Sequence, residues 1–269
     1  IANCEQLALT DGTATCTVNT LAAGTYTITA GYSNDTHFAD STGTLGGGQL
    51  VSQNGTTTAL AATANPSVYG ETVLITATVQ PAALAGAGSE IGVAATPTGT
   101  VDFAFDAVMP PTPVTVDANG MATLQIDSFT VGSHTITATY NGDTNYLVSS
   151  AEPITQVVGA AATAVSVVAD PSPSVLGQEV TFTATVAAVA PGAGTPTGDV
   201  GFTFDGNAPI TTTLGKNAVA TYVTDTLAVG THSLTINYAG DEHFQSSSEA
   251  LGNGHTVAKP DVEVTVDAN

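Results

Sequence analysis

The sequence predicts an all-β protein assembled from tandem repeats. Its 269 residues are 42% hydrophobic and 9% charged, with 28 glycines and 13 prolines to supply turns. Threonine and valine, which suit a pleated surface, are frequent, whereas strong helix formers such as lysine, arginine and methionine are scarce. Apolar and polar residues alternate with a period of two in segments such as 73–79 and 135–140, as in half-buried strands.

The charge balance excludes some classes of function. Two basic and 23 acidic residues give a formal net charge of −21. Such a chain cannot neutralise a run of phosphates, so we expect no nucleic-acid binding and no attraction to an anionic membrane surface. No stretch approaches 18 consecutive apolar residues, so no transmembrane helix or membrane insertion is expected in this segment.

Three segments recur along the chain at a spacing of about 100 residues. The first runs from a glycine to an aspartate and occurs three times; the other two begin Pro-Ser-Val and Pro-Thr-Gly and occur twice. The copies are 24–35, 132–143 and 230–241; 66–79 and 173–186; and 97–103 and 196–202. A repeat of this length has the size of an immunoglobulin-type β-sandwich.

The repeats divide the chain into four segments. Complete repeats are expected at 54–158 and 159–257, whereas 1–53 holds only the second half of a repeat and 258–269 the first strand of a further one. Either the chain is a window of a longer polypeptide, or it is a subunit completed by a strand of its neighbour. Because the junctions are only two or three residues long, we expect an extended, moderately stiff rod.

Each complete repeat offers about seven antiparallel strands. In the second repeat the candidates are 56–64, 71–79, 99–105, 112–117, 120–127, 133–141 and 146–157. A hairpin turn is expected at 117–120, where Asn-Gly occupies the turn. Tyr32, Tyr140 and Tyr238 occupy one position of the repeat and are expected in the core, with hydroxyls that need a partner at the sheet edge.

The recurring motifs resemble those of bacterial Ig-like repeat domains. They are Pro-Ser-Val-x-Gly, Pro-Thr-Gly-x-Val-x-Phe and Gly-x-His-x-(Ile/Leu)-Thr-x-x-Tyr-x-Gly-Asp, and the resemblance covers essentially the whole chain. It implies an extracellular, rod-forming module of the kind found in tandem in large surface and secreted proteins, often adhesin stalks. The chain lacks tryptophan, and its second and third repeats lack the cysteine pair that bridges the sheets of antibody domains.

The only two cysteines, Cys4 and Cys16, flank an Asp-Gly turn at 11–12. In such a hairpin they would lie roughly opposite each other, within reach of a cross-strand disulfide, which implies an oxidising compartment. The alternative is two free, buried thiols.

Three aspartates, Asp35, Asp143 and Asp241, recur in the loop before the last strand. With neighbouring asparagines and carbonyls they could bind calcium, which prefers oxygen ligands. The alternative is that aspartate simply suits a tight turn. A second place for calcium is the domain junction, near Asn65, Asp170 and Asp267.

No catalytic constellation recurs among the repeats, so we expect no enzyme and no other cofactor. His134 and His232 match Tyr26 in position, which indicates packing at a sheet edge rather than a ligand role.

The first hypothesis is therefore a structural extracellular module that forms the stalk or shaft of a bacterial surface adhesin or filament, with neighbouring repeats as its partners. One alternative is a homopolymeric filament subunit completed by a neighbour's strand. Another is a carbohydrate-binding accessory module of a secreted enzyme, which is disfavoured because aromatic residues make up only 6% of the chain.

Overall fold

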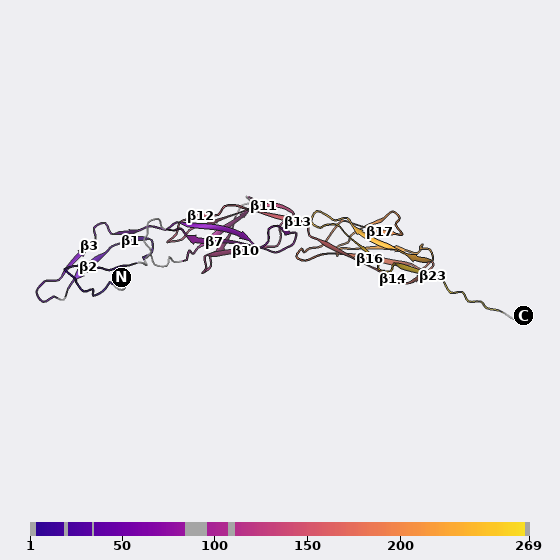
Figure 1. Ribbon diagram of the computed structural model, residues 1–269, viewed down its shortest axis with the longest axis horizontal. Helices are drawn as coiled ribbons and strands as arrows, with labels where there is room; N and C mark the ends of the chain where they lie inside the picture. Colours follow the sequence, from indigo (N-terminus) through magenta and orange to yellow (C-terminus); the bar gives the residue numbers. More distant parts are fainter. Residues whose placement is uncertain (1–3, 19–20, 34, 84–95, 107–110, 267–269) are drawn as a thin grey trace. The chain divides into compact units, whose positions relative to one another are not determined.

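The computed structural model describes residues 4–18, 21–33, 35–83, 96–106 and 111–266. These residues form strands, turns and loops without any helix (Figure 1), as the all-β prediction requires. Accordingly, no helix in the described part of the chain is long and apolar enough to cross a membrane.

The chain separates into two compact units. The third repeat lies wholly in the second unit, whereas the second repeat is divided between the two. The first unit comprises 1–61, 75–124 and 135–154, and the second comprises 62–74, 125–134 and 155–269.

The third repeat is built from two layers of strands. One layer is a three-stranded antiparallel sheet, in the order β14 (Thr163–Asp170), β16 (Val180–Ala188) and β19 (Val219–Thr224). The other layer holds two sheets, in the orders β18-β17-β21-β22 and β15-β23-β20. Their strands are β15 (Ser174–Val175), β17 (Asp199–Phe204), β18 (Ile210–Thr213), β20 (Gly230–His232), β21 (Leu234–Tyr238), β22 (Ser247–Ala250) and β23 (His255–Ala258).

The core of the third repeat follows the period-two alternation of its strands. Every second residue of β16 from Val180 to Val186 is buried, and the intervening threonines are half-buried. Phe182 and Phe202 are fully buried, and Phe182 meets Phe204 edge to face with ring centroids 5.0 Å apart. Burying a side chain of this size contributes about 1.5–3 kcal/mol, so alternation along the strands supplies the cohesion of the repeat.

The second repeat has the same order of strands. One sheet has the order β10-β7-β5, and the other has the order β6-β13-β11-β8-β9 with β12 paired to β11. The predicted last strand, 146–157, is interrupted between β12 and β13, as the equivalent strand of the third repeat is between β22 and β23. The strands are β5 (Thr56–Ala62), β6 (Ser67–Val68), β7 (Val73–Pro81), β8 (Thr100–Phe105), β9 (Thr112–Thr115), β10 (Met121–Ile126), β11 (Gly132–Tyr140), β12 (Ser149–Ser150) and β13 (Ile154–Gly159).

Residues 1–53, which we call the half-repeat, form two short hairpin ladders. β1 (Gly24–Tyr26) pairs with β4 (Gln49–Val51), and β2 (Thr29–Tyr32) pairs with β3 (Ser41–Thr44). Tyr32 faces Ser41 in this register, just as Tyr140 faces Ser149 and Tyr238 faces Ser247 in the complete repeats. The half-repeat therefore has the strand pairing of the second half of a repeat.

The tyrosine prediction holds only for the complete repeats. Tyr140 and Tyr238 are 0% and 1% exposed, whereas Tyr32 is half-buried and no described residue of the half-repeat is buried. The Tyr140 and Tyr238 hydroxyls have no strictly aligned hydrogen bond, but Asp143 and Asp241 lie close enough to act on them. Burial, reinforced by the charge of Asp143 or Asp241, raises the pKa of each phenol to about 12.

The C-terminal segment 258–269 was predicted to be the first strand of a further repeat. Beyond β23, its described residues 259–266 form no strand, and Val262, Val264 and Val266 are 82–89% exposed. The strand assignment stays a prediction.

Candidate functional site: the junction loops

The recurring aspartates of the complete repeats organise the loop that contains them. Asp143 Oδ1 accepts hydrogen bonds from the amides of Asn145 (2.8 Å) and Tyr146 (2.9 Å). Its Oδ2 accepts from the amide (2.8 Å) and the hydroxyl (2.7 Å) of Thr98, the threonine of the Pro-Thr-Gly motif. One carboxylate thus ties the loop at 141–147 to the start of β8.

The third repeat reproduces this clamp with different residues. Asp241 accepts from the amides of His243 (2.8 Å) and Phe244 (2.9 Å), and from the amide (2.9 Å) and hydroxyl (2.6 Å) of Thr197. Burial alone would raise the pKa of Asp241, but these donors outweigh it and lower the pKa to about 2. We call 141–147 and 239–245 the junction loops.

Asp35 of the half-repeat has only part of this arrangement. Its Oδ1 accepts from the amides of His37 (2.6 Å) and Phe38 (2.9 Å), and the hydrogen bond from His37 is the main reason that the pKa of Asp35 is lowered. No threonine donor reaches it among the described residues, because the Pro-Thr-Gly motif occurs only in the complete repeats.

The proposal that these aspartates bind calcium remains untested. Asp143 and Asp241 each accept hydrogen bonds from four donors. Such donors surround a carboxylate that closes a turn, whereas a calcium site presents oxygen ligands to the ion. No cluster of three or more His, Cys, Asp or Glu able to hold a metal occurs in the described part of the chain. At the second predicted place, the Asn65 amide bonds to the backbone of Thr155 and Val157, and Asp267 lies outside the described residues.

Each junction loop pairs with the first residues of its own repeat. Asn54 and Tyr146 form a parallel bridge, as do Ala161 and Phe244. In the third repeat the Ala161 amide donates to the His243 carbonyl, and the Gln245 amide donates to the Ala161 carbonyl, both at 2.8 Å. The loops therefore lie where one repeat follows the previous one.

The half-repeat touches the first of these loops. The amide of Ala23 donates to Asn145 Oδ1 at 2.9 Å, and Gln53 Nε2 donates to the carbonyl of Asp143 at 2.7 Å. Both contacts lie within the first unit. They are polar and exposed or half-buried, so they position the loop without adding an apolar interface.

The second junction loop receives an aromatic residue from the second repeat. Tyr69, from the Pro-Ser-Val-Tyr-Gly motif, lies 4.2 Å from the His243 ring and meets Phe244 edge to face at 5.5 Å between centroids. All three residues belong to the second unit. Tyr69 is half-buried and packs against the core of the third repeat, so the second repeat contributes an aromatic side chain to the core of the next one.

The backbone around Tyr69 is fitted to the loop at 189–197 of the third repeat. The amide of Ala193 donates to the Tyr69 carbonyl at 3.3 Å. A β-carbon at Gly70 would overlap the carbonyl of Ala193, whereas one at the equivalent Gly177 would meet nothing within 4 Å. Position 70 therefore requires glycine for two reasons, namely its positive φ of 76° and the close approach of Ala193 at the junction.

Sequence reasoning overlooked this contact. The equivalent of Tyr69 in the third repeat is Leu176, which is 50% exposed, so an apolar residue occupies both copies at a place where turns are usually polar. That apolar character was the available signal. Its meaning was hidden because the partner residues lie about 175 positions further along the chain.

The position shared by His232 and Tyr26 was predicted to serve only for packing at a sheet edge. In the structure, the ring at this position contacts the backbone carbonyl four residues earlier. His232 Nδ1 lies 2.7 Å from Asp205 Oδ2, and Nε2 lies 2.8 Å from the Ala228 carbonyl. Both partners are acceptors, so the geometry favours the doubly protonated ring, and the Ala228 and Asp205 contacts raise the pKa of His232. In the half-repeat, Tyr26 donates to the carbonyl of Ala22, also four residues earlier, at 2.8 Å.

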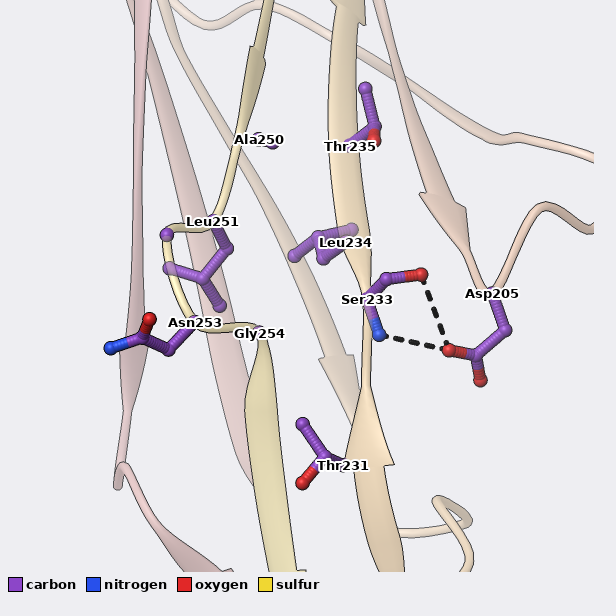
Figure 2. A pocket seen from close by; sticks show the side chains of 10 residues that line it. Asp205, Thr231, Ser233, Leu234, Thr235, Ala250, Leu251, Asn253 and Gly254 are labelled. Atoms are coloured by element: carbon purple, nitrogen blue, oxygen red, sulfur yellow. Dashed lines mark hydrogen bonds between the residues drawn. The ribbon is translucent and has the colours of Figure 1, made fainter.

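A hollow of about 460 Å³ lies beside this pair in the third repeat (Figure 2). Asp205 binds the amide (2.8 Å) and hydroxyl (3.4 Å) of Ser233 at its rim. The lining contains threonine, serine, leucine and glycine but no aromatic ring, so it offers no stacking platform for a sugar.

The predicted disulfide is present as a bond between Cys4 and Cys16, with Cα atoms 5.5 Å apart. The hairpin bridge joins Thr10 and Thr13 around the Asp-Gly turn, so Cys16 does not lie opposite Cys4 in register. Instead the chain bends at Gln6, where φ is 57°, and this brings Cys4 within reach. Whether the cysteines are oxidised in the natural compartment stays a prediction.

Comparisons with known proteins follow the repeats. A family model described as a bacterial Ig-like domain (group 3) matches residues 60–159 and 167–257. No curated protein matches the chain.

Several solved structures are similar to this chain at low identity. Fibronectin(III)-like modules of Clostridium thermocellum CbhA are 15% identical, over 79% of this chain and 100% of that one, with a TM-score of 0.30. The Yersinia pseudotuberculosis adhesin InvE is 18% identical, over 72% of this chain and 57% of that one, with a TM-score of 0.32. The Escherichia coli adhesin FdeC is 16% identical, over 75% and 64%, with a TM-score of 0.28.

Proposed function

The chain belongs to the bacterial Ig-like domain family, and on this premise we propose that it is a non-catalytic structural module of an extracellular bacterial protein. In this role the repeats form the stalk or shaft of a surface adhesin or filament. The observation that carries the proposal is the packing of Tyr69 between two successive repeats.

A spacer must resist bending at its joints, and the Tyr69 contact supports this property. The side chain packs against a junction loop and the core of the third repeat, and that loop is itself fixed by the Asp241 clamp. A joint of two or three residues combined with a packed aromatic ring restricts the swing of neighbouring repeats.

The amino-acid composition supports an extracellular location. The cysteine pair suits an oxidising compartment. Lysine and arginine together number only two among 269 residues, so the chain offers few sites to trypsin-like proteases. A net charge of −21 also keeps exposed repeats apart from one another and from anionic cell surfaces.

The mechanical part of the proposal is tested with Tyr69→Ala in the full chain. We expect residual dipolar couplings to give the second and third repeats one common alignment in the parent protein and separate alignments in the variant. Leu176→Ala, at the equivalent exposed position, is the matched control and should change neither. Independent alignment in the parent protein would contradict the proposal.

The cellular part is tested by negative-stain imaging of the native protein at the surface of its source cells. Strings of beads anchored at one end are the expected result. Uniform fibres with a regular axial repeat would instead favour the homopolymeric filament, and a saturable hit on a glycan array would favour the carbohydrate-binding alternative.

A further inference from the structure

The third repeat holds a histidine in its interior. His255 on β23 is 0% exposed, and its Nε2 lies 2.8 Å from Ser174 Oγ on the short strand β15. The other ring nitrogen, Nδ1, is buried without a hydrogen-bond partner among the described residues. Phe182 on β16 meets the imidazole edge to face, with ring centroids 5.3 Å apart. This environment accepts a neutral imidazole, whereas a protonated ring would have an N–H group without an acceptor.

The titratable neighbour of His255 is another histidine. His232 on β20 is its register partner in the adjacent strand. Both ring nitrogens of His232 face acceptors, one of them Asp205 at 2.7 Å, which favours the doubly protonated ring. The other two strands packed against His255 contribute Ser174 and Phe182, which carry no charge. Burial and the charge of His232 both lower the pKa of His255.

The second repeat has a glutamine at the same place. Gln156 and His255 each lie two residues before the valine that pairs with the serine of the Pro-Ser-Val motif. Gln156 is also 0% exposed, and it donates to Ser67 Oγ and to the Ala64 carbonyl, both at 2.9 Å. A glutamine amide does not titrate where histidine does, so the contact in the second repeat is insensitive to pH.

The second repeat also has side-chain ties at this edge that the third repeat lacks. Asn65 Nδ2 donates to the Thr155 carbonyl at 2.7 Å, and the Val157 amide donates to Asn65 Oδ1 at 3.1 Å. The third repeat has Ser172 at the position of Asn65. Among the described residues, the bond between Ser174 and His255 is the single side-chain hydrogen bond from 172–176 to β23. Its loss leaves the two-residue strand β15 with backbone bonds alone.

Solvent reaches the end of this strand pair. Gly254, next to His255, and Thr231, next to His232, both line the hollow shown in Figure 2. A proton from water therefore has only a short way to travel when the edge of the repeat opens briefly.

We propose that His255 is a pH-sensitive switch that releases β15 from β23 in the third repeat on acidification, while the second repeat stays closed. The step is the uptake of one proton from water by the imidazole, and the bonds that break are the hydrogen bonds between β15 and β23. In the released state the histidine has its ordinary pKa of 6.5, so a fall of pH below this value favours release. The inference is independent of the stalk role, since it concerns the closure of one repeat.

The test follows amide hydrogen exchange of the full chain at about pH 7.5 and about pH 5. Protection factors are compared, because they remove the intrinsic pH dependence of exchange. The Leu176 amide, which donates to the Ala258 carbonyl at 3.0 Å, reports on the pair of β15 and β23. We expect its protection to fall by roughly three- to tenfold at the lower pH, since one unit of pKa difference corresponds to a tenfold change. The amides of β13 and β16 should keep their protection.

Three variants locate the effect. His255→Gln installs the residue of the second repeat and should abolish the fall at Leu176. Gln156→His makes the reverse exchange and should create a fall in β13. His232→Gln is the matched control, because it removes the neighbouring histidine and leaves the buried one. The fall at Leu176 should persist in this variant, although it should be smaller.

Other outcomes would overturn the proposal. Equal protection of Leu176 at both pH values would do so. A fall that persists in His255→Gln, or one that disappears in His232→Gln, would place the pH response elsewhere. A fall shared by β16 and β19 would mean acid unfolding of the whole repeat instead of a local release. If His255→Gln does not fold, Gln156→His decides the question, and unchanged protection of β13 in that variant contradicts the proposal.

Discussion

The third repeat and the half-repeat have related sequences but differ in what they bury. Tyr238 and Tyr32 face serines in the same register, yet Tyr238 is 1% exposed and Tyr32 is half-buried. Both aspartates accept from two amides of their own loop, but only Asp241 also accepts from the amide and hydroxyl of Thr197. The comparison shows that local strand pairing needs only the second half of a repeat, whereas the core and the clamp need both halves.

The largest expected effect comes from truncating the shared tyrosine. Tyr238→Ala leaves a cavity in a packed core and should lower the free energy of unfolding of the third repeat by about 3–5 kcal/mol. Tyr32→Ala removes a half-buried ring and should cost less than about 1 kcal/mol. Denaturant titrations followed by hydrogen exchange in β16 and β2 measure the two effects. Equal losses would show that Tyr32 is packed as tightly as Tyr238.

The aspartate clamp should give the next largest difference. Asp241→Ala leaves four donors without an acceptor and should destabilise the third repeat by about 2 kcal/mol. Asp35→Ala frees only two exposed amides and should have a smaller effect. The matched variant Thr197→Ala removes one donor and should lie between them. A loss at Asp35 as large as that at Asp241 would contradict this account.

The clamp also has a pH signature. The folded pKa of Asp241, about 2, lies below its unfolded value of 3.8. Its stabilisation is therefore complete above pH 3.8 and is lost as the pH falls from there through about 2. Acid unfolding monitored in β16 should shift to higher pH in Thr197→Ala, because the lost hydroxyl donor no longer helps to lower the pKa of Asp241. An unchanged acid midpoint would mean that the clamp does not govern this transition.

Two histidines of the third repeat should respond to pH in opposite directions. Burial, assisted by the charge of His232, lowers the pKa of His255, so its protonation destabilises the repeat as the pH falls below 6.5. The pKa of His232 is raised, so its contribution is present below 6.5 and is lost as the pH rises through the folded value. His255→Gln, the residue at the same position of the second repeat, should remove the acid-side loss and leave the His232 trend. Melting temperatures between pH 5 and pH 8 would show it.

The smallest expected effect is that of calcium. Each carboxylate oxygen of Asp241 already accepts from two donors. Added calcium or a chelator should therefore leave the unfolding of the third repeat unchanged. A calcium-dependent rise in the melting temperature of the third repeat that is lost in Asp241→Asn would instead support calcium binding at the junction loop.

Strands and turns were predictable because their signals are local. Alternation along 73–79 and the Asp-Gly turn at 11–12 follow from neighbouring side chains, and both appear in the structure. The role of Asp241 was only half predictable. Its place in a turn was visible, but its bond to Thr197 joins residues 44 positions apart, a distance that no local pattern reports.

By itself, the sequence determined the all-β class, the repeat length and the family, because these depend on period-two alternation and on motifs that recur along one chain. The tertiary structure alone decided that Tyr69 packs against the next repeat, that Cys4 reaches Cys16 through a bend at Gln6, and that Thr197 binds Asp241. The physical reason is that burial and hydrogen-bond satisfaction depend on which segments meet in space, so similar motifs acquire different surroundings in different parts of one chain.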